Sequence, residues 1–252
     1  MKHIISILIS FLCLGHVGSY TSAGDPVNNL NMEQTKKPDE ILAFARSIQW
    51  LGQAAVRINY KGHVIYIDPF QLRSAEPADL ILITHDHEDH LSLQDIAKIA
   101  GPDTRFVVAT ACVDKLQQAG YKNIQPVLPG SKINVLGLGI TAVPAYNLVR
   151  QMHPKSRNYV GFVIDFDGIR VYHTGDTERI PEMKEIRCDI ILLPLGQTYT
   201  MTSVEEAADA VLDTKATIAI PIHWGLYEGT ANDARKFGEL LKKKNITVLT
   251  GR

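Results

Sequence analysis

The chain has 252 residues, enough to bury a full hydrophobic core in one domain or in two small ones. Apolar residues make up 45% of it and charged residues 21%, which excludes a disordered or coiled-coil protein. The formal net charge is -1 and no strong basic block occurs, so the sequence gives no support for nucleic acid or an anionic membrane surface as the main partner.

The first two dozen residues differ from the rest of the chain. A short basic start, Met1-Lys2, precedes an apolar stretch over residues 4–14, and Thr21-Ser22-Ala23 offers a small-x-small cleavage site. This pattern predicts a signal peptide over residues 1–23, with an uncleaved anchor as the alternative. We therefore expect an exported protein, periplasmic or secreted. A polar lead-in over residues 24–45 should precede one domain over residues 46–252.

The pattern becomes regular from Ile48 onward. Two apolar segments flank Lys61-Gly62, which predicts a β-hairpin. The run "LILIT" (80–84) is typical of a strand buried on both faces. Ser92 and Asp95 then resemble the start of a helix over residues 93–100, which should stop at Gly101-Pro102.

The rest of the chain alternates in the same way. We expect further strands at 105–110, within 124–146, and at 189–196 and 217–225, a second hairpin turning at Asp167-Gly168, and helices at 113–120, 203–213 and 231–244. Sheets covered by helices are the layered solution for such a pattern, so the expected fold class is α/β (α+β). For the two cysteines beyond the first segment, Cys112 and Cys188, buried free thiols are favoured over a disulfide.

Polar side chains follow several of the apolar strands at the point where each strand ends. "LILIT" leads into His85-Asp86-His87-Glu88-Asp89-His90, a later strand leads to Asp176, and another to His223. Strand ends are where layered α/β folds build their sites. Imidazole and carboxylate together suit Zn²⁺, Mn²⁺ or Fe, and no thiolate lies near these residues in the sequence. The spacing therefore predicts a metal site.

The motif "THDHEDH" resembles the signature of the metallo-β-lactamase fold superfamily, which consists largely of metal-dependent hydrolases. The likeness extends over most of residues 48–228 through "VYHTGDT", "LLPLGQTYTMT" and "IPIHWG". The segment "WLGQAAVRI…VIYIDPF" resembles the branch that contains ascorbate-6-phosphate lactonase and the N-acyl-phosphatidylethanolamine-hydrolysing phospholipase D. The resemblance implies a four-layer αββα sandwich of the metallo-β-lactamase fold, with a dinuclear metal site between the sheets.

The resemblance also implies roles for individual residues. His85 and His87 match ligands of the first metal, Asp89, His90 and His223 match ligands of the second, and Asp176 matches the carboxylate that bridges both. Two divalent metal ions are implied, with zinc favoured over manganese or iron. Asp89 and Asp176 are the expected catalytic carboxylates.

This sequence departs from the family pattern in two places. Asn147 stands where the third histidine of the first metal is expected, and His153 follows six residues later. We favour His153 as the ligand, with an open or Asn147-assisted site as the alternative. Gln53 stands where the branch often carries histidine, which puts a contact to substrate or to a ligand in doubt.

Other side chains have supporting roles in this hypothesis. Asp68 is expected to hold the histidine loop, because a ligating histidine usually donates its other N–H to such a group. His173 is expected to be a buried, hydrogen-bonded residue rather than a ligand, and Tyr199 could reach the pocket.

The function expected is hydrolysis of an ester-type bond, a phosphodiester or a lactone, by a metal-bridged hydroxide. The alternative is a non-catalytic or degenerate metal-binding or sensor protein on the same fold. The expected partner is a small-molecule or lipid-like substrate and not a nucleic acid. The sequence predicts no oligomeric state.

Overall fold

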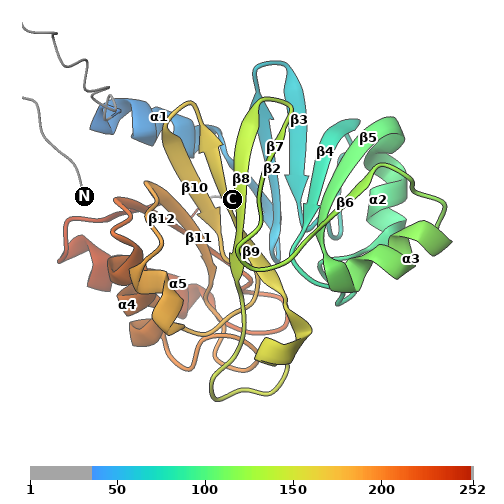
Figure 1. The fold of residues 1–252 in the computed structure, drawn as a ribbon. Helices are drawn as coiled ribbons and strands as arrows, with labels where there is room; N and C mark the ends of the chain where they lie inside the picture. The colour runs from blue at the N-terminus through green and yellow to red at the C-terminus, as the bar shows by residue number, and fades with distance from the viewer. Residues whose placement is uncertain (1–35, 251–252) are drawn as a thin grey trace, which may run out of the picture. The chain divides into compact units, whose positions relative to one another are not determined.

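A computed structural model of the chain describes residues 36–250, and the structural statements below concern this part of the chain. The signal peptide predicted over residues 1–23 and most of the predicted lead-in lie outside it. Two β-sheets pack face to face, and helices cover their outer faces (Figure 1). The four layers are those of the predicted αββα sandwich.

The first sheet comes from the first half of the chain, and its strands lie side by side in chain order. Its six strands are β1 (Gln49–Gly52), β2 (Ala55–Tyr60), β3 (His63–Ile67), β4 (Ala78–Ile83), β5 (Ala100–Ala109) and β6 (Ile124–Val127). The hairpin β2–β3 is antiparallel, and β3 to β6 run parallel. A strand with parallel neighbours on both sides is buried on both faces, which is why β4 reads as a continuous apolar run.

The second sheet has seven strands in the order β13-β12-β11-β10-β9-β8-β7. They are β7 (Lys132–Val135), β8 (Leu138–Pro144), β9 (Val160–Phe166), β10 (Ile169–His173), β11 (Ile190–Pro194), β12 (Ile218–Ile222) and β13 (Thr247–Val248). β7 to β10 form an antiparallel meander, and β10 to β13 run parallel. The predicted hairpin at Asp167-Gly168 is the turn between β9 and β10.

Helices pack on the outside of each sheet. They are α1 (Pro38–Ser47), α2 (Leu93–Ile99), α3 (Val113–Gln118), α4 (Val204–Thr214) and α5 (Ala231–Lys242), with short 3-10 turns η1 (Thr110–Cys112), η2 (Lys155–Arg157) and η3 (Pro181–Lys184). In residues 36–250, no helix combines the length and the apolar character that crossing a membrane would need.

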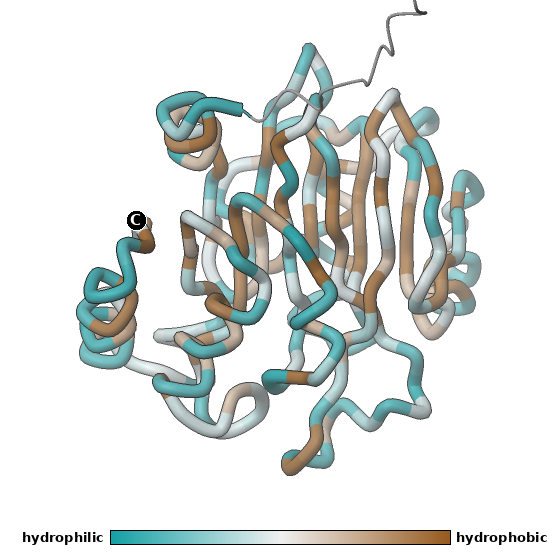
Figure 2. Tube along the Cα trace, turned by 60° about the vertical axis from the view of Figure 1, so that its left-hand side comes forward, coloured by the Kyte–Doolittle hydropathy of each residue, from teal (hydrophilic) through white to brown (hydrophobic). Residues whose placement is uncertain are grey.

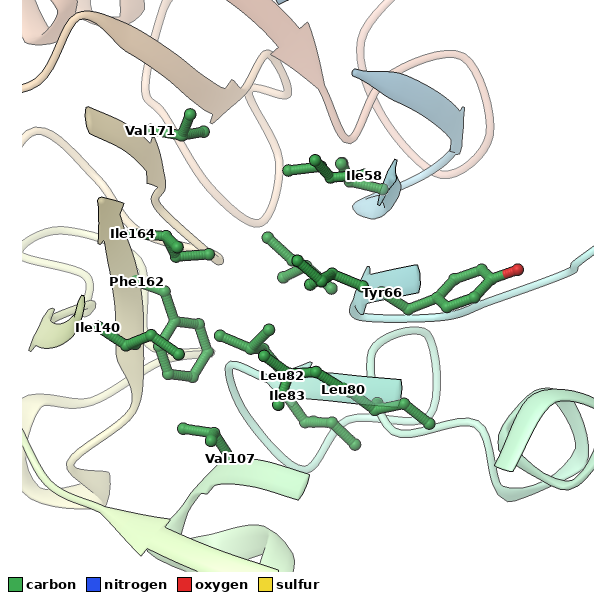
Figure 3. Close-up of a cluster of buried hydrophobic side chains, with 14 of the residues drawn as sticks. Ile58, Tyr66, Leu80, Leu82, Ile83, Val107, Ile140, Phe162, Ile164 and Val171 are labelled. Carbon is green, nitrogen blue, oxygen red and sulfur yellow. The ribbon is translucent and has the colours of Figure 1, made fainter. Parts of the chain in front are cut away.

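The main core fills the space between the two sheets. Ile58, Leu82 and Val107 of the first sheet face Phe162 and Ile164 of the second, and all five are buried (Figure 3). A second cluster packs the outer face of the second sheet against α4 and α5. Along the tube in Figure 2 the strands are largely apolar, whereas most of the exposed connections are hydrophilic. The loops after the strands are therefore carried on a rigid base.

Two local expectations differ from the structure. Residues 93–100 were predicted as a helix ending at Gly101-Pro102, but α2 ends at Ile99 and β5 begins at Ala100, because Ala100 pairs with Ala78 of β4. The predicted lead-in over residues 24–45 contains most of α1, whose Ile41 and Ala45 are buried in the main core. The domain limits themselves stay a prediction. Cys112 and Cys188 are both buried free thiols, as predicted.

Candidate metal centre

The histidine-rich loop leaves the end of β4 and turns back on itself at once. The backbone N–H groups of His90 and Leu91 both donate to the carbonyl of His87, at 3.0 and 2.8 Å. Ser92 then caps α2 by accepting from the N–H of Asp95. This tight turn brings His85, His87 and His90 to one side, because the helix that follows fixes where the loop must end.

Three other loops bring their side chains to the same place. His153 comes from the connection between β8 and β9, Asp176 from the loop after β10, and His223 from the residue directly after β12. β10, β11 and β12 run parallel, so their carboxyl ends meet at one edge of the second sheet. The loops at the lower edge in Figure 1 therefore hold the site together from both sheets.

Asp176 lies at the centre of the cluster. Its Oδ2 lies 3.2 Å from Nε2 of His223, 3.3 Å from that of His90, 3.5 Å from that of His153 and 3.9 Å from that of His85. Asp89 Oδ2 lies 3.5 Å from His223 Nε2 and 3.6 Å from His90 Nε2.

Three overlapping sets of residues have ligand atoms within 4.8 Å of one another: His85, His87 and His153; His85, His90 and Asp176; Asp89, His90 and His223. All seven predicted ligands therefore meet in one cluster.

The donor atoms in this cluster fit divalent cations. Nε2 of His85, His90 and His153 and Oδ1 of Asp176 are buried, and they have no hydrogen-bond partner within the described chain. A buried polar atom without a partner is costly, so a group of such atoms aimed at one another indicates a missing ligand. Imidazole nitrogens and carboxylate oxygens are the donors that zinc, manganese and iron accept. The chain thus has the residues to hold a metal.

The electrostatics of the site also favour a cation. Burial lowers the pKa of His85 well below its ordinary value and that of His153 to about 4, so both rings are neutral at pH 7 and ready to ligate. Burial alone would lower the pKa of His90, but Asp176 and Asp68 raise it to about 10. Burial would raise the pKa of Asp176, yet His223 and His90 hold it well below its usual range. Positive charge therefore stabilises the buried carboxylates of the site, and metal ions can supply that charge in place of protons on the histidines.

Asp68 supports the histidine loop in the way the sequence predicts. Its buried Oδ2 lies 2.8 Å from Nδ1 of His90 and accepts from Thr84 Oγ1 at 2.6 Å, and its Oδ1 accepts from the Thr84 N–H at 2.8 Å. A carboxylate on Nδ1 keeps the proton there and leaves Nε2 free toward the cluster.

Asn147 and His153 are the two candidates for the third ligand of the first metal, and the structure places them differently. His153 Nε2 points into the cluster, while its Nδ1 lies 2.6 Å from Oδ1 of Asn147. The amide of Asn147 contacts Glu178 and the carbonyl of Tyr199. Asn147 thus orients His153, and the geometry favours His153 as the ligand. Its ligation stays a prediction.

Glu228 is a supporting residue that the sequence reasoning missed. Its Oε1 lies 2.8 Å from Nδ1 of His223, although the approach is off the line of a good hydrogen bond. Its Oε2 accepts the N–H groups of Thr198 and Tyr199 at 2.9 and 2.7 Å, and Oε1 accepts from Thr200 Oγ1 at 2.9 Å. One carboxylate thus connects a predicted ligand, His223, to the loop after β11.

Glu178, also missed, acts similarly on the loop that carries His153. Its carboxylate accepts the backbone N–H groups of Leu148, Val149 and Arg150 at 2.6–2.7 Å. The sequence signal was weak in both cases. Glu178 directly follows the "GDT" motif, and Glu228 comes five residues after His223.

The remaining predicted residues lie around the cluster. Gln53 Nε2 lies 2.8 Å from Asp89 Oδ2 and 2.7 Å from His223 Nε2. His173 is buried outside the cluster, with Nε2 2.9 Å from the carbonyl of Ala54 and Nδ1 accepting the Gly175 N–H. Tyr199 borders the open side.

Three residues at the site adopt left-handed backbone conformations. Gln53 and Asp68 have φ near +47°, and His223 has φ of +57°. A left-handed conformation costs a non-glycine residue about 1–2 kcal/mol. Backbone hydrogen bonds stabilise it here, from His223 N–H to the carbonyl of Gln53 and from Asp68 N–H to that of Leu82. Such strain is characteristic of functional sites.

A cavity of about 540 Å³ opens onto the cluster. His87, Asp89, His153, Asp176 and His223 form its floor, and Phe70, Glu88, Met152, Tyr199 and Tyr227 form its walls. This volume falls in the range of pockets for small molecules. The candidate ligands are therefore accessible to a substrate.

The chain is similar to known metal-dependent hydrolases. Residues 47–223 match the model of the β-lactamase superfamily domain. The UPF0173 metal-dependent hydrolase of Methanopyrus kandleri is 32% identical over 80% of this chain and 94% of its own length, and that of Thermoplasma acidophilum is 35% identical over 77% and 89%. The crystal structure of a candidate metal-dependent hydrolase from Parabacteroides distasonis superimposes with a TM-score of 0.71 at 32% identity, covering 80% of this chain and 90% of that one.

The same comparisons correct the prediction of a signal peptide and of a secreted or periplasmic protein, for which they give no support. The archaeal relatives are matched over 89–94% of their own length by 77–80% of this chain. The shared domain thus accounts for nearly all of each relative, and the family gives no support to export. Residues 1–23, on which that expectation depended, lie outside the described residues.

Proposed function

The chain belongs to the metallo-β-lactamase superfamily, in its UPF0173 family of metal-dependent hydrolases, and we propose that it hydrolyses an ester-type bond of a small molecule at a dinuclear zinc site. The observation that carries the proposal is the cluster itself. Buried, unpartnered Nε2 atoms of three histidines converge on Asp176 at the floor of an open cavity.

The residues divide into two ligand sets that share Asp176. His85, His87 and His153 would hold one ion, and Asp89, His90 and His223 the other. When bound, two divalent cations acidify a water molecule toward pKa 7 and polarise the bond under attack. Asp176 contributes to both sets because its Oδ2 lies within 4 Å of histidines in each.

Asp89 is suited to orient the attacking water. Burial would raise its pKa, but His223 and His90 lower it to about 2, so the carboxylate is ionised at neutral pH. Its side chain is 22% exposed and lines the cavity, whereas that of Asp176 is almost wholly buried. A water on that side can donate a hydrogen bond to Asp89, and the same carboxylate can pass its proton to the leaving group.

The type of ester bond and the branch of the superfamily belong to the proposal as well. The sequence resemblance to ascorbate-6-phosphate lactonase and to the N-acyl-phosphatidylethanolamine phospholipase D allows a lactone or a phosphodiester. The rival is a metal-binding protein without turnover. It would require the same ligands, so the cluster alone does not separate the two.

Two measurements test the proposal together. Elemental analysis of the protein purified without chelators should find about two metal equivalents per chain, as two ligand sets imply. The same preparation should hydrolyse at least one of p-nitrophenyl acetate, p-nitrophenyl hexanoate and bis(p-nitrophenyl) phosphate, and lose that activity in EDTA. One equivalent would refute the dinuclear site. Two equivalents without hydrolysis of any of them would favour the binding protein.

A further inference from the structure

The walls of the cavity differ in character from its floor. Above the ligands, four of the five wall residues are aromatic or thioether side chains, namely Phe70, Met152, Tyr199 and Tyr227. The rings of Phe70 and Tyr227 lie 6.5 Å apart, tilted by 39°. Walls of this kind hold apolar groups by contact area rather than by charge.

Apolar exposure is concentrated on the loops around this opening. Between residues 36 and 250, nine large hydrophobic side chains are more than a third exposed, and six of them lie on three loops beside the cavity: Leu148, Val149, Met152, Tyr199, Leu226 and Tyr227. Figure 2 shows apolar stretches on the loops at the lower edge of the sheets. A soluble domain rarely gathers its exposed apolar side chains in one place without a ligand for them.

These loops are fixed rather than loose. Glu178 holds the backbone of residues 148–150, and Asp95 accepts the N–H groups of Gln71 and Leu72, directly after Phe70. Glu228 holds residues 198–200. Buried or half-buried carboxylates thus anchor the backbone beside three of the four apolar wall residues.

Three basic side chains near the opening are engaged elsewhere. Arg150 donates to the carbonyl of Gln197, Lys155 pairs with Glu182 at 2.9 Å, and Arg157 pairs with Asp86 at 2.8 Å. Among the described residues that line the cavity none is lysine or arginine, and Glu88 adds a carboxylate. Phosphate recognition ordinarily uses guanidinium or ammonium groups. A phosphodiester would therefore find no side-chain cation among these lining residues to hold its free oxygen.

We propose that the substrate is a neutral carboxylic ester or lactone whose acyl part carries an apolar chain, seated against Phe70, Met152, Tyr199 and Tyr227. This inference rests on the proposed hydrolase function and narrows its substrate class. Water adds to the acyl carbon, the C–O bond to the leaving alcohol breaks, and that oxygen takes up a proton. The products are a carboxylic acid and an alcohol, which stay joined as one hydroxy acid when the substrate is a lactone.

The test compares substrates with the same leaving group. Zinc-loaded full-length protein is assayed on p-nitrophenyl acetate, butyrate and hexanoate and on bis(p-nitrophenyl) phosphate. In a half-open apolar pocket, each added methylene should raise kcat/KM about two- to fourfold. Hexanoate should thus exceed acetate by at least about tenfold and should also exceed the phosphodiester. Met152→Ser and Tyr227→Ser should each reduce the hexanoate-to-acetate ratio several-fold, whereas Leu128→Ser, at an exposed leucine away from the cavity, should leave it unchanged.

A binding measurement separates the cavity from catalysis. Saturation-transfer NMR should detect hexanamide on the wild-type protein, more weakly on Met152→Ser, and acetamide on neither. A flat chain-length series, or preference for the phosphodiester, would overturn the inference and leave the hydrolase standing. Hydrolysis of none of the four substrates would count against the proposed function itself. Adsorption of the wild type to phosphatidylcholine vesicles with a flat series would assign the apolar side chains to a lipid surface instead.

Discussion

Glu228 offers the sharpest test of how the candidate site is built, because its two oxygens face different partners. Oε1 lies against His223 Nδ1, and Oε2 accepts the backbone N–H groups of Thr198 and Tyr199. The variant Glu228→Gln keeps the shape of the side chain but gives it only one acceptor oxygen. Either the His223 side or the backbone of residues 198 and 199 must then face the amide NH₂ instead of an acceptor oxygen.

The choice follows from counting donors. With the amide NH₂ toward residues 198 and 199, two backbone N–H groups would lose their acceptor, at about 1–3 kcal/mol each. With the NH₂ toward His223, both backbone bonds survive, and the two partners of Oε1 can change roles: the Thr200 hydroxyl rotates to accept from the amide, and the imidazole accepts on Nδ1. Its proton then sits on Nε2, the atom that faces Asp176 and Asp89, and it must leave before a metal binds. We expect this second orientation, with a loss of metal affinity of about 10–100-fold at one site.

The assay is a Zn²⁺ competition titration with a chelating dye, combined with thermal unfolding of the metal-free protein. Glu228→Gln should weaken one of two zinc equivalents but change the Tm of the metal-free protein only slightly, because both backbone hydrogen bonds of residues 198 and 199 survive in the expected orientation. Glu185→Gln makes the same chemical change at an exposed position and should alter neither quantity. Wild-type zinc affinity together with a lowered Tm would refute the reasoning, because Glu228 would then act on the loop alone.

Three further predictions follow from the geometry. His87→Ala or Asp176→Ala should reduce turnover of any substrate found by about a thousandfold or more while circular dichroism stays native, and full activity in either would contradict the ligand assignment. Gly196→Ala should cost more than about 3 kcal/mol in urea unfolding, because the added Cβ would lie 1.7 Å from Glu228 Cδ; an unchanged midpoint would disprove that packing. Gly238→Ala on α5 meets no atom within 4 Å and should instead stabilise the protein by about 0.5–1 kcal/mol in the same experiment.

The fold was predictable because its signals are local and periodic. The hairpin turns at Lys61-Gly62 and Asp167-Gly168, the apolar run of β4 and the cap at Ser92 each occupy a few consecutive residues. The start of β5 was not predictable in this way. Gly101 and Pro102 normally end regular structure, but here the chain continues as a strand because Ala100 pairs with β4, a contact that no local pattern encodes.

The meeting of the predicted ligands in one cluster was predictable for a related reason. Parallel strands bring their carboxyl ends to one edge, so polar residues after β4, β10 and β12 could be expected to meet even though they are far apart in sequence. His153 was harder, because it lies in a loop rather than at a strand end. Its ring is aimed by the hydrogen bond between its Nδ1 and Oδ1 of Asn147 and by packing against His85, His87 and Tyr159.

The residues that hold the ligands escaped prediction because their position depends on how a loop returns. Glu228 reaches His223 only because the backbone closes a turn between them, in which Gly225 donates to the Glu228 carbonyl and Gly229 has φ of +64°. With any other course of the loop the carboxylate would lie in solvent, which is where most glutamate side chains are found. Candidate ligands can thus be predicted from sequence spacing, whereas the residues that support them can be identified only from the folded loop. It follows that substitutions in the turn at Gly225 and Gly229 should affect metal binding through Glu228, although neither glycine is a predicted ligand.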